Sequence, residues 1–326
     1  MAVTPRTKAG LVKFRPVEQG SSIALVAPAS HFKRPEFDAG VAELRRLGFR
    51  PAFDDAVFRR DVIVAGSSAH RGEDFTRAWT SDADAVIAVR GGYGSVEILP
   101  ILDRARLLAH RTAFVGYSDV TSLHLYLNGQ LGHTSIHGVM VEGRLALGPA
   151  FYDEASFYTT FSSAPLGEVA HEGLETLIGG EAQGPIFGGT LTQLVSSLGT
   201  PYAFDPPAGS VVFIDEVRER PYRLRRMLAQ LRQSGRLANV AALVFGQCPD
   251  CDEPAATGRQ SHDGAAAPIT ARAVIKDCLA DFGGPILFGF PSGHTTTPLV
   301  SVPFGVDTRV IAGERPRLVF LEAAAG

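Results

Sequence analysis

The sequence predicts an α/β protein whose first half is a doubly wound parallel sheet. Short apolar runs of strand length alternate with stretches of helical apolar spacing from residue 23 to residue 127. Glycine- and serine-containing turns follow two of these runs directly, at residues 90–95 and 116–119. Strands that alternate with helices pair in parallel through right-handed crossovers, which gives a sheet covered on both faces.

Elements of the first half are marked by apolar spacing and by glycine or proline at their ends. Residues 23–27 (IALVA) form an apolar run that ends at Pro28, as expected for a buried strand. A helix is expected next, because apolar residues repeat at helical spacing from Phe37 to Leu47 and stop at Gly48. Further strands are expected at residues 62–65, 85–89 and 113–115, and a short helix at residues 73–80.

The apolar periodicity fades from residue 145 to residue 184. This stretch contains Ser-Ser-Ala-Pro at residues 162–165 and a Gly-Gly pair at residues 179–180, as is typical of a connector. We therefore expect an N-terminal domain at residues 1–160, a linker at 161–184 and a C-terminal domain at 185–326.

The second half is also expected to mix helices and strands. Helical apolar spacing begins at Leu191 and again at Leu224. Short apolar runs predict strands at residues 211–214, 241–245, 286–288, 299–302 and 318–321.

Composition limits the class of protein. With 326 residues, of which 45% are hydrophobic, the chain can bury a substantial core, which excludes a disordered protein. The formal net charge of −3 favours no nucleic-acid partner. No apolar stretch reaches the length of a signal peptide or a bilayer span, so we expect no membrane partner and a cytoplasmic location. Three cysteines are too few for a disulfide framework and agree with a reducing compartment.

Residues 112–128 (TAFVGYSDVTSLHLYLN) predict a strand, a tight turn and a helix. A serine on such a turn is lifted out of the sheet beside the first N–H groups of the helix, which suits a nucleophile that attacks a carbonyl. Ser118 is therefore a candidate nucleophile, although serine and aspartate are also ordinary helix N-caps.

Residues 90–95 (RGGYGS) lie after another strand and carry clustered glycines. Such loops can hold a phosphate, but the sequence has no Gly-Lys-Ser/Thr ending, and Glu97 occupies the place of the third glycine of the dinucleotide pattern. The alternative use of exposed N–H groups is to stabilise an oxyanion beside Ser118. In a parallel sheet both turns fall at the carboxyl edge, where ligands bind.

A serine nucleophile requires a base, usually histidine, and a carboxylate that orients the histidine. Among nine histidines, His294 is the first candidate, because it lies in a small polar loop after the strand expected at residues 286–288. His137 is the second candidate. For the acid, Asp215 and Glu216 follow the strand expected at residues 211–214, and side-chain alternation points them to opposite faces.

Cys248 and Cys251 form a Cys-x-x-Cys pair. It resembles half of a zinc site or a redox pair, but there is no second pair and no helix begins at it, so we expect neither a metal nor a cofactor. Residues 248–268, rich in Pro, Gly, Ala and charge, are expected to form a mobile loop.

Taken together, these segments resemble the LD-carboxypeptidase family, the serine peptidases that include the murein tetrapeptide carboxypeptidases and the microcin C self-immunity proteins. The resemblance covers nearly the whole chain. It is carried by residues 89–95 (VRGGYGS), 116–119 (GYSD) with Thr121, 188–192 (GGTLT), 213–228, 289–294 (GFPSGH) and 303–305 (PFG).

The resemblance implies a flavodoxin-like N-terminal domain related to class I glutamine amidotransferases, a smaller C-terminal α/β domain and a Ser-Glu-His triad shared between them. Ser118 and His294 match directly. The family's glutamate aligns with Asp215, so either Asp215 serves with a shorter side chain or the strand end shifts to present Glu216. Val139 and Thr190 stand where the family usually has proline and often asparagine.

The function implied is hydrolysis of an L,D-peptide bond in a muropeptide, with release of terminal D-Ala during cell-wall recycling. We expect the N–H groups of Gly92 and Asp119 to form the oxyanion hole. Family members are often dimers, so a homodimer is possible. One alternative is a microcin C-type self-immunity hydrolase that acts on aminoacyl-adenylate analogues, and a second is a non-catalytic module that binds an anion at residues 90–95.

Overall fold

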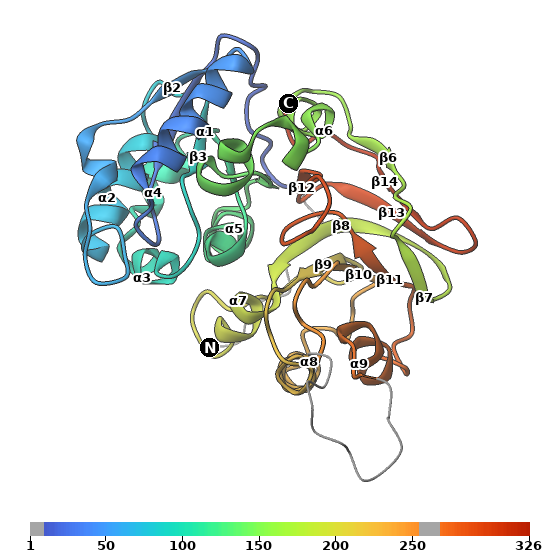
Figure 1. Cartoon of the computed structure of the whole chain (residues 1–326). Helices are drawn as coiled ribbons and strands as arrows, with labels where there is room; N and C mark the ends of the chain where they lie inside the picture. Colours follow the sequence, from blue (N-terminus) through green and yellow to red (C-terminus); the bar gives the residue numbers. More distant parts are fainter. Residues whose placement is uncertain (1–9, 254–267) are drawn as a thin grey trace.

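The computed structural model describes residues 10–253 and 268–326 and contains two β-sheets, each flanked by helices. The first sheet with its helices and the second sheet with its helices form two lobes that lie side by side (Figure 1). This arrangement confirms the expected mixed α/β class. Most of the loop expected at residues 248–268 lies outside the described residues.

The first sheet has six strands in the order β12-β5-β4-β3-β1-β2. Strands β1 to β5 pair in parallel, and their order 2-1-3-4-5 is that of flavodoxin-like sheets. The antiparallel strand β12 comes from the C-terminal part of the chain. The bounds are β1 (Ser22–Val26), β2 (Arg50–Ala52), β3 (Ala85–Ala88), β4 (Ala113–Gly116), β5 (Ser135–His137) and β12 (Val302–Phe304).

Helices cover both faces of this sheet. On one face, Phe37, Val41 and Leu44 of α1 enter the same core as Ile87 of β3. On the other face, the core includes Phe75 of α2 and residues of α5. This two-sided burial explains why the strands are continuous apolar runs. The bounds are α1 (Arg34–Arg46), α2 (Ser68–Trp79), α3 (Ser95–Ile98), α4 (Arg104–Leu108), α5 (Thr121–Tyr126) and α6 (Glu154–Phe161).

The second sheet has eight strands in the order β6-β14-β13-β8-β9-β10-β11-β7. Strands β8, β9, β10 and β11 are parallel neighbours, and the outer strands are antiparallel. The strands are β6 (Gly167–Val169), β7 (Glu175–Ile178), β8 (Gly180–Thr190), β9 (Val211–Asp215), β10 (Ala242–Gly246), β11 (Ile286–Phe290), β13 (Asp307–Ala312) and β14 (Arg317–Phe320). The helices are α7 (Leu191–Ser196), α8 (Pro221–Gln233) and α9 (Ala271–Cys278).

Three expectations about elements are wrong. Residues 62–65 are not a strand: Val62 is 88% exposed, and the edge of the sheet is instead formed by β2. Residues 161–184 are not a plain connector, because they contain β6, β7 and the start of β8. These strands lie mostly at the sheet margins and pair through their backbones, so they show little apolar periodicity. Of residues 299–302, only Val302 is in a strand, and that strand belongs to the first sheet. The domain limits stay a prediction.

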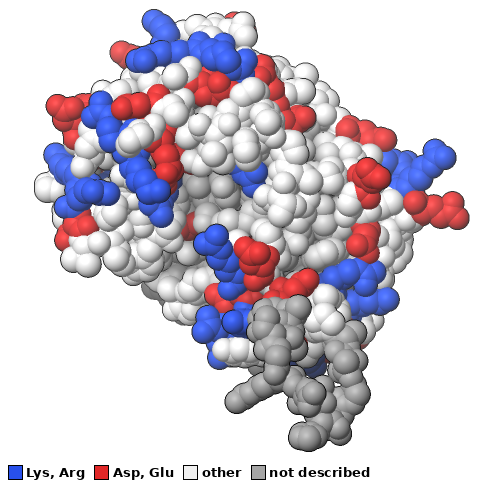
Figure 2. Space-filling model, in the orientation of Figure 1, with Lys and Arg blue, Asp and Glu red and all other residues white. Residues whose placement is uncertain are grey.

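The surface and the helices add two observations. Basic and acidic side chains are interspersed over the face shown in Figure 2. Within residues 10–253 and 268–326, every helix is too short or too polar to cross a bilayer.

Candidate active site

Ser118 stands on a sharp turn between β4 and α5. Its φ of 67° lies in the left-handed region, which a non-glycine residue enters at an energetic cost, and such strain clusters at functional sites. The turn also requires Gly116, because a Cβ there would lie 2.6 Å from Cγ2 of Val120. A 3₁₀ turn, Ser118–Val120, leads directly into α5. The serine is therefore presented at the carboxyl edge of the sheet, beside the start of a helix.

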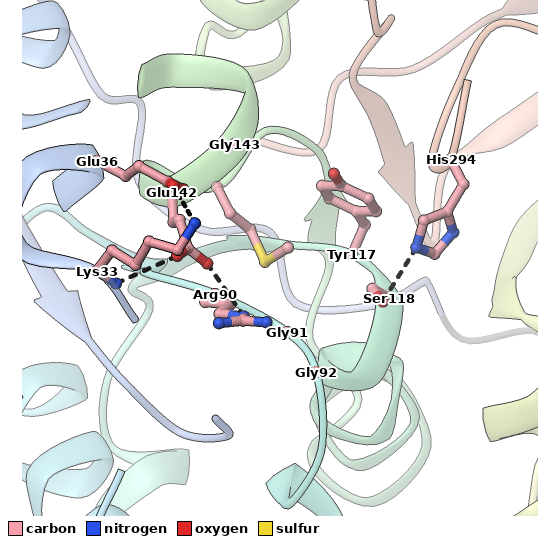
Figure 3. Close-up of a pocket in the computed structure, with 11 residues that line it drawn as sticks. Lys33, Glu36, Arg90, Gly91, Gly92, Tyr117, Ser118, Glu142, Gly143 and His294 are labelled. Carbon is pink, nitrogen blue, oxygen red and sulfur yellow. Dashed lines mark hydrogen bonds and ion pairs between the residues drawn. The ribbon is translucent and has the colours of Figure 1, made fainter. Parts of the chain in front are cut away.

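His294 and Asp215 meet Ser118 from the second lobe. Nε2 of His294 lies 3.1 Å from Oγ of Ser118 (Figure 3), and Nδ1 lies 2.6 Å from Oδ2 of Asp215. The backbone N–H of His294 also donates to Oδ2 of Asp215, at 2.9 Å. The three residues follow β4, end β9 and follow β11, so the structure brings together groups that are far apart in sequence.

The surroundings of Asp215 keep it ionised. Its complete burial by itself raises the pKa, but the charge of His294, the nearby ring of His137 and the hydrogen bond from His294 together outweigh this effect. The net result is a pKa well below the usual range of an aspartate. Thr190 donates to the other carboxylate oxygen, Oδ1, at 2.9 Å.

Glu216, the other candidate acid, points away from His294. Its Oε2 accepts hydrogen bonds from the backbone N–H and the hydroxyl of Thr192, at 2.8 and 2.6 Å. Burial raises the pKa of Glu216, and the hydrogen bonds from Thr192 only partly offset this. As expected from side-chain alternation, Asp215 contacts His294 and Glu216 contacts Thr192 of α7.

Gly293 leaves room for the Asp215 carboxylate to approach His294. It has a φ of +72°, and a Cβ at this position would lie 2.4 Å from Oδ2 of Asp215. Any larger residue would push the carboxylate away from His294 or displace the loop.

We therefore expect Gly293→Ala to lower kcat about 100-fold, because a displacement of about 1 Å in a catalytic group has an effect of that size. Gly235→Ala is the matched control, since Gly235 has a similar φ of +78° and a Cβ there meets nothing within 4 Å. Steady-state kinetics and thermal unfolding of the two variants check the expectation, and equal kcat values for both would contradict it.

The glycine-rich loop at residues 90–95 lies against the serine turn. A Cβ on Gly91 would lie 3.0 Å from Cβ of Ser118, so the close approach requires glycine. Gly92 has a φ of +94° and, like Gly91, lines the cavity at Ser118. Backbone N–H groups at the start of a helix, such as that of Asp119, have no partner within the helix. The sequence-predicted pair, Gly92 and Asp119, thus flanks the serine.

The side chain of Asp119 fixes this arrangement. Its Oδ2 accepts the backbone N–H of Ser95 at 2.9 Å, and the hydroxyl of Ser95 donates to its carbonyl oxygen at 2.7 Å. Gln193 of α7 donates to Oδ1 at 3.2 Å. Burial raises the pKa of Asp119, and hydrogen bonds from Ser95 act in the opposite direction. One carboxylate therefore ties the serine turn to the glycine loop and to the second lobe.

A cavity of about 320 Å³ opens beside Ser118 and His294. Two ion pairs line it: Nζ of Lys33 lies 3.0 Å from Glu36, and Nε of Arg90 lies 3.0 Å from Glu142 (Figure 3). Sequence reasoning did not select Lys33, Glu36 or Glu142. Lys33 and Glu36 follow β1 at the carboxyl edge of the sheet, and that position was the available signal.

Comparison with known proteins gives the family. Residues 23–138 match the model of the LD-carboxypeptidase N-terminal domain, and residues 183–310 match that of the C-terminal domain. The chain belongs to the LD-carboxypeptidase family. This LD-carboxypeptidase is 31% identical to the murein tetrapeptide carboxypeptidase of Pseudomonas aeruginosa, over 90% of this chain and 94% of the relative. Membership confirms the expected enzyme class, a hydrolase of the carboxypeptidase type.

Solved structures are similar over almost the whole LD-carboxypeptidase. The muramoyltetrapeptide carboxypeptidase of Oxalobacter formigenes is 26% identical, with a TM-score of 0.76, and the match covers 92% of this chain and 98% of that one. The microcin self-immunity protein MccF, in complex with glutamyl sulfamoyl guanosine, is 20% identical with a TM-score of 0.84, and covers 96% and 99%. The second likeness shows the fold alone.

The remaining candidate histidine of the LD-carboxypeptidase, His137, does not reach Ser118. Its ring is fully buried behind Asp215, with Nε2 3.8 Å from Oδ1. A further buried histidine, His124, bonds to Gly116 and Ser135, and burial together with the nearby His137 lowers its pKa to about 3.

Cys248 and Cys251 are free, buried thiols in this LD-carboxypeptidase. Burial raises the pKa of both, that of Cys251 to about 12, which keeps them protonated at neutral pH. Among residues 10–253 and 268–326, no group of three His, Cys, Asp or Glu side chains is placed to hold a metal ion.

Proposed function

We propose that the protein is a serine carboxypeptidase that hydrolyses an L,D-peptide bond and releases terminal D-Ala from murein tetrapeptides. The observation that carries the proposal is the chain of contacts from Ser118 through His294 to Asp215, at 3.1 and 2.6 Å. The similarity to the murein tetrapeptide carboxypeptidase of Pseudomonas aeruginosa supports the substrate class.

In the proposed reaction, Nε2 of His294 takes the proton of the Ser118 hydroxyl, and Oγ attacks the carbonyl carbon on the L-centre side of the bond. Asp215 holds the tautomer with the proton on Nδ1 and stabilises the imidazolium that forms. Backbone N–H groups of Gly92 and Asp119 donate to the oxyanion, and each such donor contributes about 3 kcal/mol.

The tetrahedral intermediate collapses when His294 gives its proton to the nitrogen of D-Ala, which leaves as the free amino acid. An ester between Ser118 and the remaining peptide is left. A water molecule, deprotonated by His294, then attacks this ester, and the hydroxyl of Ser118 is restored. No oxidant, metal or cofactor takes part in the proposed steps.

Release of D-Ala from a murein tetrapeptide tests the proposal. The purified protein is incubated with the tetrapeptide and, in parallel, with an aminoacyl-sulfamoyl adenylate, and products are separated by mass. Turnover of the peptide at least about tenfold faster supports the carboxypeptidase, whereas the reverse ratio supports the self-immunity alternative. Acylation of Ser118 by a serine-directed reagent is also expected. Failure of both substrates and of labelling would leave the anion-binding alternative.

Two observations about the cavity agree with a catalytic rather than a purely anion-binding site. The cations Lys33 and Arg90 are each paired with a carboxylate, so the cavity does not present unpaired positive charge from these residues. Ser118 is held in a strained conformation that simple anion binding does not require.

The proposal also includes a cytoplasmic location, a role in peptidoglycan recycling and a possible homodimer. Light scattering of the purified protein tests the dimer. Fractionation of cells that express it tests the location.

A further inference from the structure

His137 lies directly behind the candidate triad and has no role in the steps above. It ends β5, in register with Gly116 of β4, two residues before Ser118. Its ring is fully buried against aromatic side chains of both lobes, with ring centroids 5.1 Å from Phe213 and 5.3 Å from Phe304. A polar ring in this setting requires polar partners, because an unpaired buried donor is costly.

The two ring nitrogens of His137 have different surroundings. Nδ1 lies 3.3 Å from the buried hydroxyl of Ser292. Nε2 is buried, has no hydrogen-bond partner in the described part of the chain, and points at Oδ1 of Asp215 from 3.8 Å. This distance is about 0.9 Å longer than an ordinary N–H···O bond.

The other contacts of Asp215 leave a place for this donor. Oδ2 is fully used by His294, which donates from its backbone and from Nδ1. Among the described residues, Oδ1 accepts a hydrogen bond only from the hydroxyl of Thr190, at 2.9 Å. A carboxylate oxygen can accept two hydrogen bonds, so Oδ1 can take one more donor.

We propose that His137 is a positioning residue for the triad acid: its Nε2–H donates to Oδ1 of Asp215 and fixes the plane of the carboxylate toward His294. Ser292 donates its hydroxyl proton to Nδ1 and thereby selects the tautomer with the proton on Nε2. The proposed bond requires the gap of 3.8 Å to shorten by about 0.9 Å. The inference rests on the proposed function.

Three of the groups around this pair, Tyr117, His124 and Cys248, stay uncharged at neutral pH. Burial raises the pKa of Tyr117 and of Cys248, and lowers that of His124 to about 3. These three groups therefore do not change their charge near neutral pH. The titratable or charged groups that face them are Tyr117 after β4, His124 on α5, Arg144 after β5, Glu216 after β9 and Cys248 after β10.

The test compares His137→Met, which fills the space without a donor, with His137→Gln, whose amide N–H can replace Nε2–H. We expect His137→Met to lower kcat about 10- to 100-fold with little change in KM, the range for a lost hydrogen bond to a charged group. The acidic limb of the kcat/KM profile should move to higher pH, because a carboxylate with one donor fewer stabilises the His294 imidazolium more. His137→Gln should restore kcat to within about fivefold and return the limb to its wild-type position.

Two controls separate positioning from core packing. His133 is also buried and also has a ring nitrogen, Nδ1, without a hydrogen-bond partner among the described residues, but it packs against Trp79. His133→Met should leave the acidic limb unchanged. Ser292→Ala should move the limb in the same direction as His137→Met. Ser301→Ala, which removes a buried hydroxyl that has no hydrogen-bond partner in residues 10–253 and 268–326, should not move it.

The inference is overturned if His137→Met keeps the wild-type kcat and pH limb, or if the Met and Gln variants lose activity equally with the limb unmoved. If His137→Met does not fold, Ser292→Ala decides, and an unmoved limb overturns the inference. Failure of the proposed function has a different signature, because Ser118→Ala would then retain D-Ala release. Loss of activity in Ser118→Ala together with a wild-type profile in His137→Met would reject only the role of His137.

Discussion

Replacing Ser118 with alanine is expected to lower kcat for D-Ala release by at least about 10⁴-fold. The substitution removes the attacking oxygen and the partner of Nε2 of His294, whereas the backbone turn and the buried contacts of Asp119 remain. Kinetics with a murein tetrapeptide measure the loss, and circular dichroism with thermal unfolding shows whether the fold is intact.

A matched serine-to-alanine change distinguishes loss of chemistry from loss of stability. Ser67 caps α2 by accepting the backbone N–H of His70 at 3.3 Å, and it does not line the cavity at Ser118. Ser67→Ala should reduce stability by about 1 kcal/mol and leave kcat unchanged. Activity of Ser118→Ala above about one per cent of wild type would remove Ser118 from the mechanism.

The second large effect is expected for Asp215→Asn, which should lower kcat about 10³- to 10⁴-fold. The side-chain amide of the Asp215→Asn variant presents either an N–H donor or a neutral oxygen to Nδ1 of His294. It therefore no longer stabilises the His294 tautomer that has its proton on Nδ1 and leaves Nε2 free to accept the serine proton. Glu216→Gln is the control. Its site bonds to Thr192 and not to His294, so kcat should stay within about threefold of wild type. Equal losses in the two variants would contradict the assignment of Asp215.

The Asp215→Asn variant also tests how the stability of the fold depends on pH. The folded-state pKa of Asp215 lies below its unfolded value, so its ionisation stabilises the fold above about pH 4 and this contribution disappears as the pH falls further. The stability difference between wild type and Asp215→Asn should therefore shrink below pH 4. Urea unfolding at several pH values measures it, and a constant difference would exclude the effect.

Much of the first sheet could be predicted because its strands are buried on both faces. Continuous apolar runs such as those at β3 and β4 are typical of buried strands, and both strands are buried. The apolar run that begins at residue 62 is exposed, so its pattern did not indicate a strand correctly. The margins of the second sheet could not be predicted. Strands such as β6 and β7 are held by backbone pairing at exposed positions, and backbone pairing leaves no residue pattern.

The candidate site follows the same division. Ser118 and His294 could be predicted because each lies just after a buried strand, and the carboxyl ends of parallel strands share one edge. The choice between Asp215 and Glu216 could not be made from the sequence, because it depends on which face of β9 meets the first lobe. The roles of Gln193 and Glu142 depend on packing between distant segments, for which one sequence gives no signal.

The position of β12 has a consequence for synthesis of the protein. Residues 302–304 close the open side of β5, the strand that carries His137 and neighbours the serine turn. A nascent chain that ends before residue 302 therefore exposes the unprotected margin of a sheet, a template for association with other chains. Truncated products should therefore aggregate, because the first sheet is complete only when nearly the entire polypeptide has been synthesised.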